Sequence, residues 1–368
     1  MGELRMISAD SHVVEPADLW TKRIDARFKD RAPRVVSKSG DLEGDLFVCE
    51  ELPPIPVASL AVAGVDEGEY PEKMFAGYEN VPRGGWDPAA RLEDQDTDGV
   101  DAEVLYTSIG MAMYGLEDGE LRAAIFRAYN DWVADFCSYE PKRFAGIALI
   151  PMDDVGEAVH EIERTTARGL RGGMIWGDPP ADRPYDAVEW EPVWAAAQAA
   201  NFPLSLHILT GSKGTGVEWS SIMRGYGTMH HGIQRSLSTM LFGGVFERFP
   251  GLKIVSAEND AGWIGHFIQR LDHAYHKYRS LETQAVIPEP PSFYVHRQVF
   301  ATFQDDLVGV RSRADIGVGN LMWASDFPHS DSTWPQSRKV VERDFAGVPE
   351  DEVKRIVHDN CAELYGLG

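Results

Sequence analysis

Short apolar segments alternate with longer amphipathic segments along most of the chain. The apolar segments are short enough for buried strands, and the amphipathic segments have the spacing of helices. Near-continuous apolar strands separated by helices are typical of a parallel sheet, and eight such units predict a closed (β/α)8 TIM-like barrel. The alternative is an open doubly wound sheet, which normally has a glycine-rich turn after its first strand. The predicted strands are 6–12, 102–106, 144–151, 172–176, 203–208, 252–258, 299–303 and 321–326, and the predicted helices are 89–98, 118–139, 155–168, 191–200, 231–249, 263–279 and 350–364.

The stretch from about residue 16 to residue 88 breaks this alternation. It is rich in proline and glycine, as in 53–56 and 83–88, and it is too long for a plain loop in a compact domain. Its content of Leu, Val, Phe and Tyr argues against the alternative of disorder. We therefore expect one barrel domain over residues 1–368 that carries an inserted subdomain or flap at about 16–88, after its first strand.

Composition and charge exclude several classes of function. The chain has 368 residues, 43% apolar and 25% charged, which is typical of a globular protein. Its 35 basic and 58 acidic residues give a net charge of −23, which disfavours binding to nucleic acids or anionic membranes. Apolar runs fall short of the roughly 18 residues that a membrane span needs. The three cysteines are far apart and odd in number, so we expect no disulfide framework and a cytoplasmic location.

Acidic and imidazole side chains stand where the predicted strands end. Asp10 and His12 close the first strand, His207 the fifth, Glu258 the sixth and Asp326 the eighth. Asp10 and His12 point the same way if the chain is extended, which is a chelating arrangement. Alone, each would fit an ordinary turn or core residue. Their convergence at the carboxyl end of one barrel predicts an open site for a divalent ion, zinc or manganese.

The same residues resemble a known family. The pattern Asp10-x-His12, His207, the run 255–258 followed by Gly262-Trp263, and the run 325–329 resemble the amidohydrolase superfamily. More narrowly, they resemble its amidohydrolase-related branch, which includes aminocarboxymuconate semialdehyde and resorcylate decarboxylases. The similarity extends over nearly the whole chain.

This resemblance implies one metal ion per chain, zinc or alternatively manganese, held by Asp10, His12, His207 and Asp326. Two positions depart from the common pattern. An acid, Asp10, replaces the first histidine of H-x-H, as it does in some decarboxylases of the branch. Glu258 occupies the sixth-strand position that is often a histidine, so the family role of that position does not transfer directly.

The leading functional hypothesis is a metal-dependent decarboxylase that acts on a small aromatic or unsaturated carboxylic acid. The alternative is a hydrolase that cleaves a C–C bond of a ring-fission product, an amide or a lactone, and a third possibility is a binding protein with a decayed site. Either reaction would use Asp326 for proton transfer. His329, His231 and Glu258 are the other catalytic candidates, although the pair His230-His231 fits the start of a helix equally well.

Two further expectations concern neighbouring segments. The glycine-rich run 211–216 lacks the full phosphate-binding pattern and predicts a mobile loop, whose Lys213 could meet a substrate carboxylate. The apolar run 246–252 and the long insertion predict apolar surface, and with it a homodimer or a higher homo-oligomer.

Overall fold

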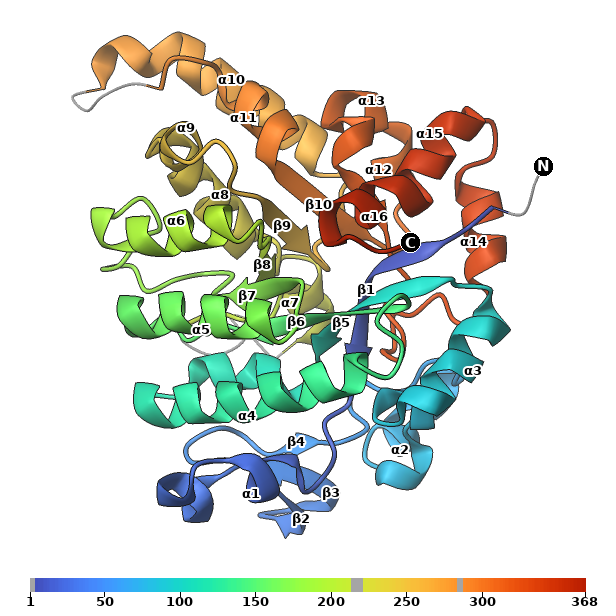
Figure 1. The fold of residues 1–368 in the computed structure, drawn as a ribbon. Helices are drawn as coiled ribbons and strands as arrows, with labels where there is room; N and C mark the ends of the chain where they lie inside the picture. The colour runs from blue at the N-terminus through green and yellow to red at the C-terminus, as the bar shows by residue number, and fades with distance from the viewer. Residues whose placement is uncertain (1–3, 213–220, 283–286) are drawn as a thin grey trace.

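Eight parallel strands form a nearly closed barrel in the computed structural model, which describes residues 4–212, 221–282 and 287–368 (Figure 1). Each strand hydrogen-bonds to the next one along the chain, and every pair is parallel. The predicted (β/α)8 fold is therefore confirmed. The barrel strands are β1 (Ile7–Val13), β5 (Ala102–Thr107), β6 (Phe144–Leu149), β7 (Gly172–Ile175), β8 (Leu204–His207), β9 (Ile254–Ala257), β10 (Val299–Phe303) and β11 (Leu321–Trp323).

The barrel closes between β1 and the segment that follows β11. The backbone N–H of Asp326 donates to the carbonyl of Asp10 at 2.9 Å, and the N–H of His12 donates to the carbonyl of Phe327 at 2.7 Å. These two hydrogen bonds replace a regular ladder at this seam. As a result, the polar residues at the end of β1 lie beside those that follow β11.

Helices lie between the strands and cover the outside of the barrel (Figure 1). Aspartates begin four of the described helices: the side chains of Asp87, Asp118, Asp154 and Asp306 accept hydrogen bonds from first-turn N–H groups, which is the usual capping arrangement. The helices within and after the barrel units are α3 (Pro88–Asp98), α4 (Gly119–Cys137), α5 (Val155–Ala167), α6 (Glu191–Ala199), α7 (Ile222–Tyr226), α8 (His231–Phe242), α9 (Val245–Arg248), α10 (Ile264–Tyr278), α11 (Pro291–Gln298), α12 (Leu307–Arg311), α13 (Arg313–Ile316), α14 (Ser337–Asp344), α15 (Glu350–Lys354) and α16 (Asn360–Tyr365).

Two predicted helices differ in detail from the observed ones. The helix predicted at 231–249 is split into α8 and α9, because Gly244 has a left-handed φ of +71° that a continuous helix cannot contain. The closing helix predicted at 350–364 is interrupted by a π-helical turn at Arg355–Asp359. Neither change alters the order of the barrel units.

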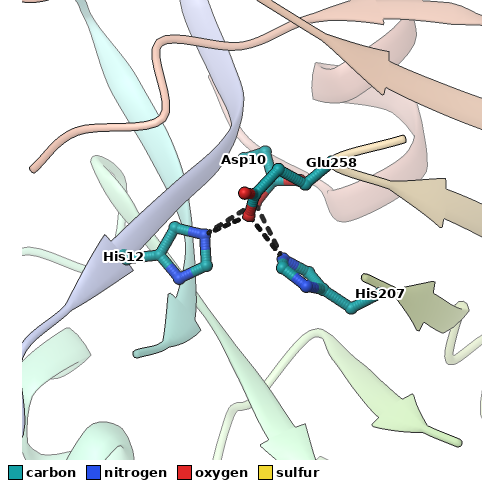
Figure 2. Close-up of side chains that lie close together, drawn as sticks. All are labelled: Asp10, His12, His207 and Glu258. Atoms are coloured by element: carbon teal, nitrogen blue, oxygen red, sulfur yellow. Dashed lines mark hydrogen bonds and ion pairs between the residues drawn. The ribbon is translucent and has the colours of Figure 1, made fainter. Parts of the chain in front are cut away.

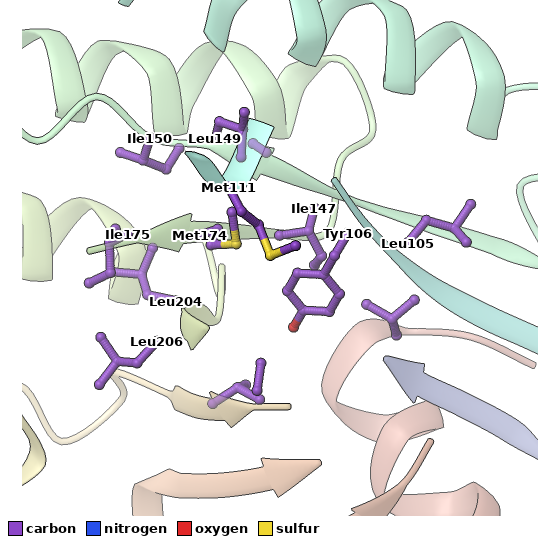
Figure 3. Close-up of a cluster of buried hydrophobic side chains, with 14 of the residues drawn as sticks. Leu105, Tyr106, Met111, Ile147, Leu149, Ile150, Met174, Ile175, Leu204 and Leu206 are labelled. Carbon is purple, nitrogen blue, oxygen red and sulfur yellow. The ribbon is translucent and has the colours of Figure 1, made fainter. Parts of the chain in front are cut away.

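The apolar side chains of the strands fill the space inside the barrel and between the sheet and the helices. Figure 3 shows part of this core, with Leu105, Ile147, Met174 and Leu204 drawn from four successive strands. All four side chains are buried. The core thus holds the strand ends, and the polar groups on them, in fixed positions.

The segment between β1 and α3 contains a small antiparallel sheet (Figure 1). Its hairpin turns at Gly40-Asp41, a turn signal between two strand-like runs that could have been recognised in the sequence. Two hydrogen bonds join this segment to the loop after β11: Ala63 N–H to the Pro328 carbonyl, and the Tyr70 hydroxyl to the Ser330 carbonyl. The elements of the segment are α1 (Leu19–Arg23), β2 (Arg34–Ser39), β3 (Leu42–Val48), β4 (Ile55–Pro56) and α2 (Tyr70–Lys73).

The apolar run 246–252 does not provide the surface that we expected. Phe246 and Leu252 are fully buried inside the chain because they pack into its own core. Exposed apolar side chains lie elsewhere, and Val188 and Met223 are the most exposed of those described. The run 246–252 therefore gives no support for a homo-oligomer, which stays a prediction. Among the described helices, none has the length and apolar character needed to cross a membrane.

Candidate metal centre

Four side chains from three strand ends meet at the carboxyl end of the barrel. Figure 2 shows Asp10 and His12 from β1, His207 from β8 and Glu258 after β9 pointing toward one another. Nε2 of His12 lies 3.5 Å from Oδ1 of Asp10 and 3.1 Å from Oε2 of Glu258. Nε2 of His207 lies 3.6 and 3.3 Å from the same two oxygens.

Backbone carbonyls fix the orientation of both imidazoles. Nδ1 of His12 lies 2.7 Å from the carbonyl oxygen of Thr107, and Nδ1 of His207 lies 3.0 Å from that of Ile208. A carbonyl oxygen can only accept, so each Nδ1 carries the hydrogen and donates it. In the neutral imidazole, Nε2 then presents its lone pair to the centre of the cluster. A hydrogen bond from the other ring nitrogen to a backbone carbonyl is common among metal-binding histidines.

The donor atoms at the centre fit a single divalent ion. Oδ1 of Asp10 and Nε2 of His207 are buried without a hydrogen-bond partner, which is costly unless something else satisfies them. Ligands that share one ion through bonds of about 2.1 Å lie roughly 3.0 to 3.4 Å apart, close to the observed separations of 3.1 to 3.6 Å. Two imidazole nitrogens and two carboxylate oxygens suit zinc or manganese.

The charges of the cluster also favour a cation. Burial lowers the pKa of His12, but the carboxylates of Asp10, Glu258 and Asp326 outweigh it, so its pKa is raised well above the usual value. Burial likewise opposes the charged form of Asp10, but contacts with His12 and His207 lower the pKa of its carboxyl. The centre is therefore a region of negative potential that stabilises positive charge.

Asp326 and His329 lie on the other side of His12. In the described part of the chain, a second group of possible ligands consists of His12, Glu258, Asp326 and His329. Oδ1 of Asp326 lies 3.4 Å from Nε2 of His12 and 3.2 Å from Nδ1 of His329. The ring of His329 stacks on that of His12 with a centroid distance of 3.8 Å. Burial raises the pKa of Asp326 and lowers the pKa of His329 well below its usual value.

A threonine that the sequence analysis did not single out links two of the carboxylate residues. Thr302 in β10 donates from Oγ1 to Oδ2 of Asp10 at 2.8 Å, and the same Oγ1 accepts from the N–H of Glu258 at 2.8 Å. Glu258 and Asp326 both have left-handed backbones, with φ of +53° and +54°. Such conformations are unusual for residues other than glycine and are often found at functional sites.

A buried arginine holds the seam beside the cluster. Arg91 of α3 is fully buried and pairs with Glu103 of β5 through two hydrogen bonds of 2.6 and 3.0 Å. It also donates to the carbonyl of His12 at 2.7 Å and to that of Phe327 at 3.2 Å. One guanidinium therefore fixes the backbone on both sides of the barrel seam.

The remaining sequence candidates lie at different distances from the cluster. His231 begins α8, is exposed, and lines a cavity of about 250 Å³ together with His207, Asp178 and Arg235. Its neighbour His230 stacks against Trp263. Lys213 lies outside the described residues. The structure thus brings Asp10, His12, His207, Glu258, Asp326 and His329 together and leaves His231 at the side of the mouth.

The strand-end rule that identified the candidate ligands also covers two residues that support them. Ser108 directly follows β5, and Thr302 is the next-to-last residue of β10. Both are polar residues at the carboxyl end of an apolar strand, where barrel sites are built. Arg91 could not have been found in this way, because its sequence position is that of an ordinary cation on an amphipathic helix.

Comparisons with known proteins agree with this architecture. The Amidohydrolase family profile matches residues 12–367. The gamma-resorcylate decarboxylase of Rhodococcus jostii is 24% identical over 336 residues, which cover 81% of this chain and 95% of that protein. An amidohydrolase from Mycobacterium avium subsp. paratuberculosis superposes with a TM-score of 0.78 at 22% identity and covers all of both chains.

A further solved structure is a dihydroxybenzoic acid decarboxylase from Polaromonas sp. with bound manganese and the inhibitor 2-nitroresorcinol. It has a TM-score of 0.67 at 18% identity and covers 98% of this chain and 97% of its own. These structural likenesses establish the fold, and the family match over nearly the whole chain confirms the resemblance that the motifs suggested. The chain belongs to the amidohydrolase family.

Proposed function

We propose that this protein is a metal-dependent decarboxylase that acts on a small aromatic or unsaturated carboxylic acid. The observation that carries the proposal is the cluster of imidazole nitrogens and carboxylate oxygens at the mouth of the barrel, in which Oδ1 of Asp10 and Nε2 of His207 are buried without a hydrogen-bond partner. The decarboxylase relatives support the choice of reaction, since gamma-resorcylate decarboxylase is among them.

In this proposal Asp10, His12 and His207 hold the ion. Asp326, the fourth ligand that the family resemblance implies, lies 3.4 Å from Nε2 of His12 in the segment after β11. A bound divalent ion would act as a Lewis acid and would offset the negative charge of the substrate carboxylate. The donor set suits zinc, which we expect, and also manganese, which the Polaromonas decarboxylase contains.

The side chains around Asp326 are arranged to hold one proton. The Ser108 hydroxyl donates to the carbonyl of Val13 at 2.8 Å, so toward His329 it can only accept, and Nε2 of His329 must be the donor in their 2.9 Å contact. A neutral His329 then has a bare Nδ1 that faces Oδ1 of Asp326 at 3.2 Å. A proton shared by this pair is therefore carried on Asp326 or on Nδ1 of His329.

Decarboxylation requires that proton. When the bond between the substrate carbon and its carboxylate breaks, the electron pair stays on the carbon and CO2 leaves. Asp326 then delivers the proton to that carbon, which balances the reaction R–COO⁻ + H⁺ → R–H + CO2. Glu258 and His231 remain candidates for orienting the substrate, and the segment around Ala63 and Tyr70, which is bonded to the loop after β11, would cover the mouth.

A hydrolase is the second candidate, because the same residues could instead activate a water molecule with Asp326 as the base. The similar structure from Mycobacterium avium subsp. paratuberculosis is named an amidohydrolase, which is compatible with hydrolysis. A binding protein with a decayed site is disfavoured by the intact set of donors.

The test begins with elemental analysis of protein purified without added metal, for which we expect close to one equivalent of a divalent ion per chain. The metal-loaded protein is then incubated with a panel of hydroxybenzoates and unsaturated dicarboxylic acids in D2O. Release of CO2 with one deuterium in the product supports the decarboxylase. Cleavage of amide or lactone substrates without CO2 release from any acid would instead establish the hydrolase.

A further inference from the structure

We infer that Glu258 is a direct ligand of the metal ion, in addition to Asp10, His12 and His207. This inference rests on the metal site of the proposed function but not on the decarboxylation reaction. It adds Glu258 to a ligand set that the family resemblance limited to Asp10, His12, His207 and Asp326.

The distances carry the first step. Oε2 of Glu258 lies 3.1 and 3.3 Å from Nε2 of His12 and His207, closer to both nitrogens than Oδ1 of Asp10, at 3.5 and 3.6 Å. Any ion that both imidazoles and Asp10 can reach is therefore within reach of Glu258 as well. Figure 2 shows the Glu258 carboxylate directed at this common point.

The hydrogen bonds carry the second step. Both imidazoles donate from Nδ1 to backbone carbonyls, so only Nε2 of each ring is turned toward the oxygen of Glu258. Nε2 of His12 and Oε2 of Glu258 lie 3.1 Å apart and need a cation between them, either a shared proton or a metal ion. Nε2 of His207 is buried without a hydrogen-bond partner. The carboxylate is thus placed where an ion would bind it.

The backbone carries the third step. Glu258 adopts a left-handed φ of +53°, and its N–H donates to Thr302, which in turn donates to Asp10. Thr302 therefore joins the backbone of Glu258 to the carboxylate of Asp10. Two adjacent anions with little exposure, 13% for the Glu258 side chain and 1% for Asp10, need a shared counter-charge.

This assignment separates two tasks among the acids of the site. Within the described residues, His12 and Glu258 belong to both groups of possible ligands, the first with Asp10 and His207 and the second with Asp326 and His329. Asp10, His12, His207 and Glu258 would by themselves supply four protein donors from β1, β8 and the end of β9. Asp326 would then be able to share a proton with His329.

The experiment measures the affinity of the protein for Mn²⁺ alone, by competition with a chelating indicator. Glu258→Ala should weaken Mn²⁺ binding at least 100-fold, and Glu258→Gln, which keeps one neutral oxygen donor, should weaken it less. The matched control is Asp305→Asn, which removes an exposed acid that is paired with Arg343 and should leave the affinity within threefold of wild type.

Circular dichroism of the chelated proteins confirms that each variant is folded. The absorption spectrum of the Co²⁺-substituted protein reports the ligand set directly and should change in Glu258→Gln even where binding persists. Unchanged Mn²⁺ affinity in Glu258→Ala, with an unchanged Co²⁺ spectrum in Glu258→Gln, would overturn the inference. Since neither readout uses substrate, that result is distinct from a failure of CO2 release, which would count against the decarboxylase alone.

Discussion

Replacing Arg91 tests whether one buried ion pair supports both the fold and the metal centre. Arg91 and Glu103 are both almost completely buried, 0 and 2% exposed, and their pair is joined by two hydrogen bonds. Arg91→Met removes the cation and leaves the Glu103 carboxylate, among the described residues, with the side-chain amide of Gln95 at 2.6 Å as its hydrogen-bond partner.

The size of the effect follows from that uncompensated charge. Breaking a buried pair by removing one partner typically costs about 3–5 kcal/mol. With an unfolding entropy of roughly 2.1 cal/mol/K per residue over 368 residues, this loss lowers Tm by about 4–6 °C. The carbonyls of His12 and Phe327 lose the same donor. We therefore also expect metal affinity to fall by about 10- to 100-fold, as it does when supporting contacts of a metal ligand are lost.

The assay is thermal unfolding in the presence of a chelator, which separates the fold from the metal, followed by a Mn²⁺ titration of the folded protein. Arg355→Met is the control, because the Arg355–Glu363 pair is exposed and such pairs contribute at most about 1 kcal/mol. Arg91→Met combined with Glu103→Gln should recover part of the stability but not the metal affinity. A loss of less than 1 kcal/mol in Arg91→Met alone would refute the reasoning.

Three other predictions concern the site, a buried acid and the assembly. Asp326→Asn should retain most of the metal but lower kcat by roughly 10²-fold or more, whereas His12→Ala should lose the metal. Near-normal turnover in Asp326→Asn with metal bound would show that Asp326 is only a ligand. Burial raises the pKa of Asp98, which accepts hydrogen bonds from Ser337, to about 6. A raised carboxyl pKa means that the folded state holds the proton more tightly than the unfolded state, so protonation of Asp98 stabilises the fold. This contribution to the free energy of unfolding is fully present below about pH 4. It is lost as the pH rises through 6, by up to roughly 3 kcal/mol. Denaturant unfolding of Asp98→Asn at pH 4.5 and 7.5 should show a correspondingly smaller pH effect than wild type. Light scattering at micromolar concentration should report a homodimer or a higher homo-oligomer, and a monomer alone would reject that prediction.

The barrel and the positions of the metal-binding candidates could be predicted because both depend on local signals. A short apolar run predicts a buried strand, and a polar residue directly after it predicts a group at the mouth of the barrel. Asp10, His12 and His207 each follow this rule, and the structure places all three within one cluster. The same rule covers Ser108 and Thr302, but serine and threonine are weaker indicators of a site than acids and histidines, because they are also common in ordinary turns.

Other features could not be predicted because they depend on contacts between distant segments. Arg91 is buried because α3 packs where β1 meets the segment after β11. Its hydrogen-bond partner Phe327 in that segment lies 236 residues further along the chain. The direction of the Glu258 side chain depends on a left-handed backbone that no residue pattern indicates. Hydrophobicity favours the burial of Phe246 and Leu252 either inside the chain or between chains, and only the packing of distant segments places them inside.

The charge of the site links metal binding to substrate binding. Three carboxylates, those of Asp10, Glu258 and Asp326, lie around the imidazoles of His12 and His207, in a protein whose net charge is already −23. In a poorly hydrated pocket, a substrate carboxylate is repelled by such a group, because like charges are weakly screened there. A divalent ion would offset two of these negative charges and would offer the substrate carboxylate a positive charge at close range. The acids that hold the ion are thus compatible with an acidic substrate only when the ion is present, which makes the metal a condition for binding as well as for chemistry.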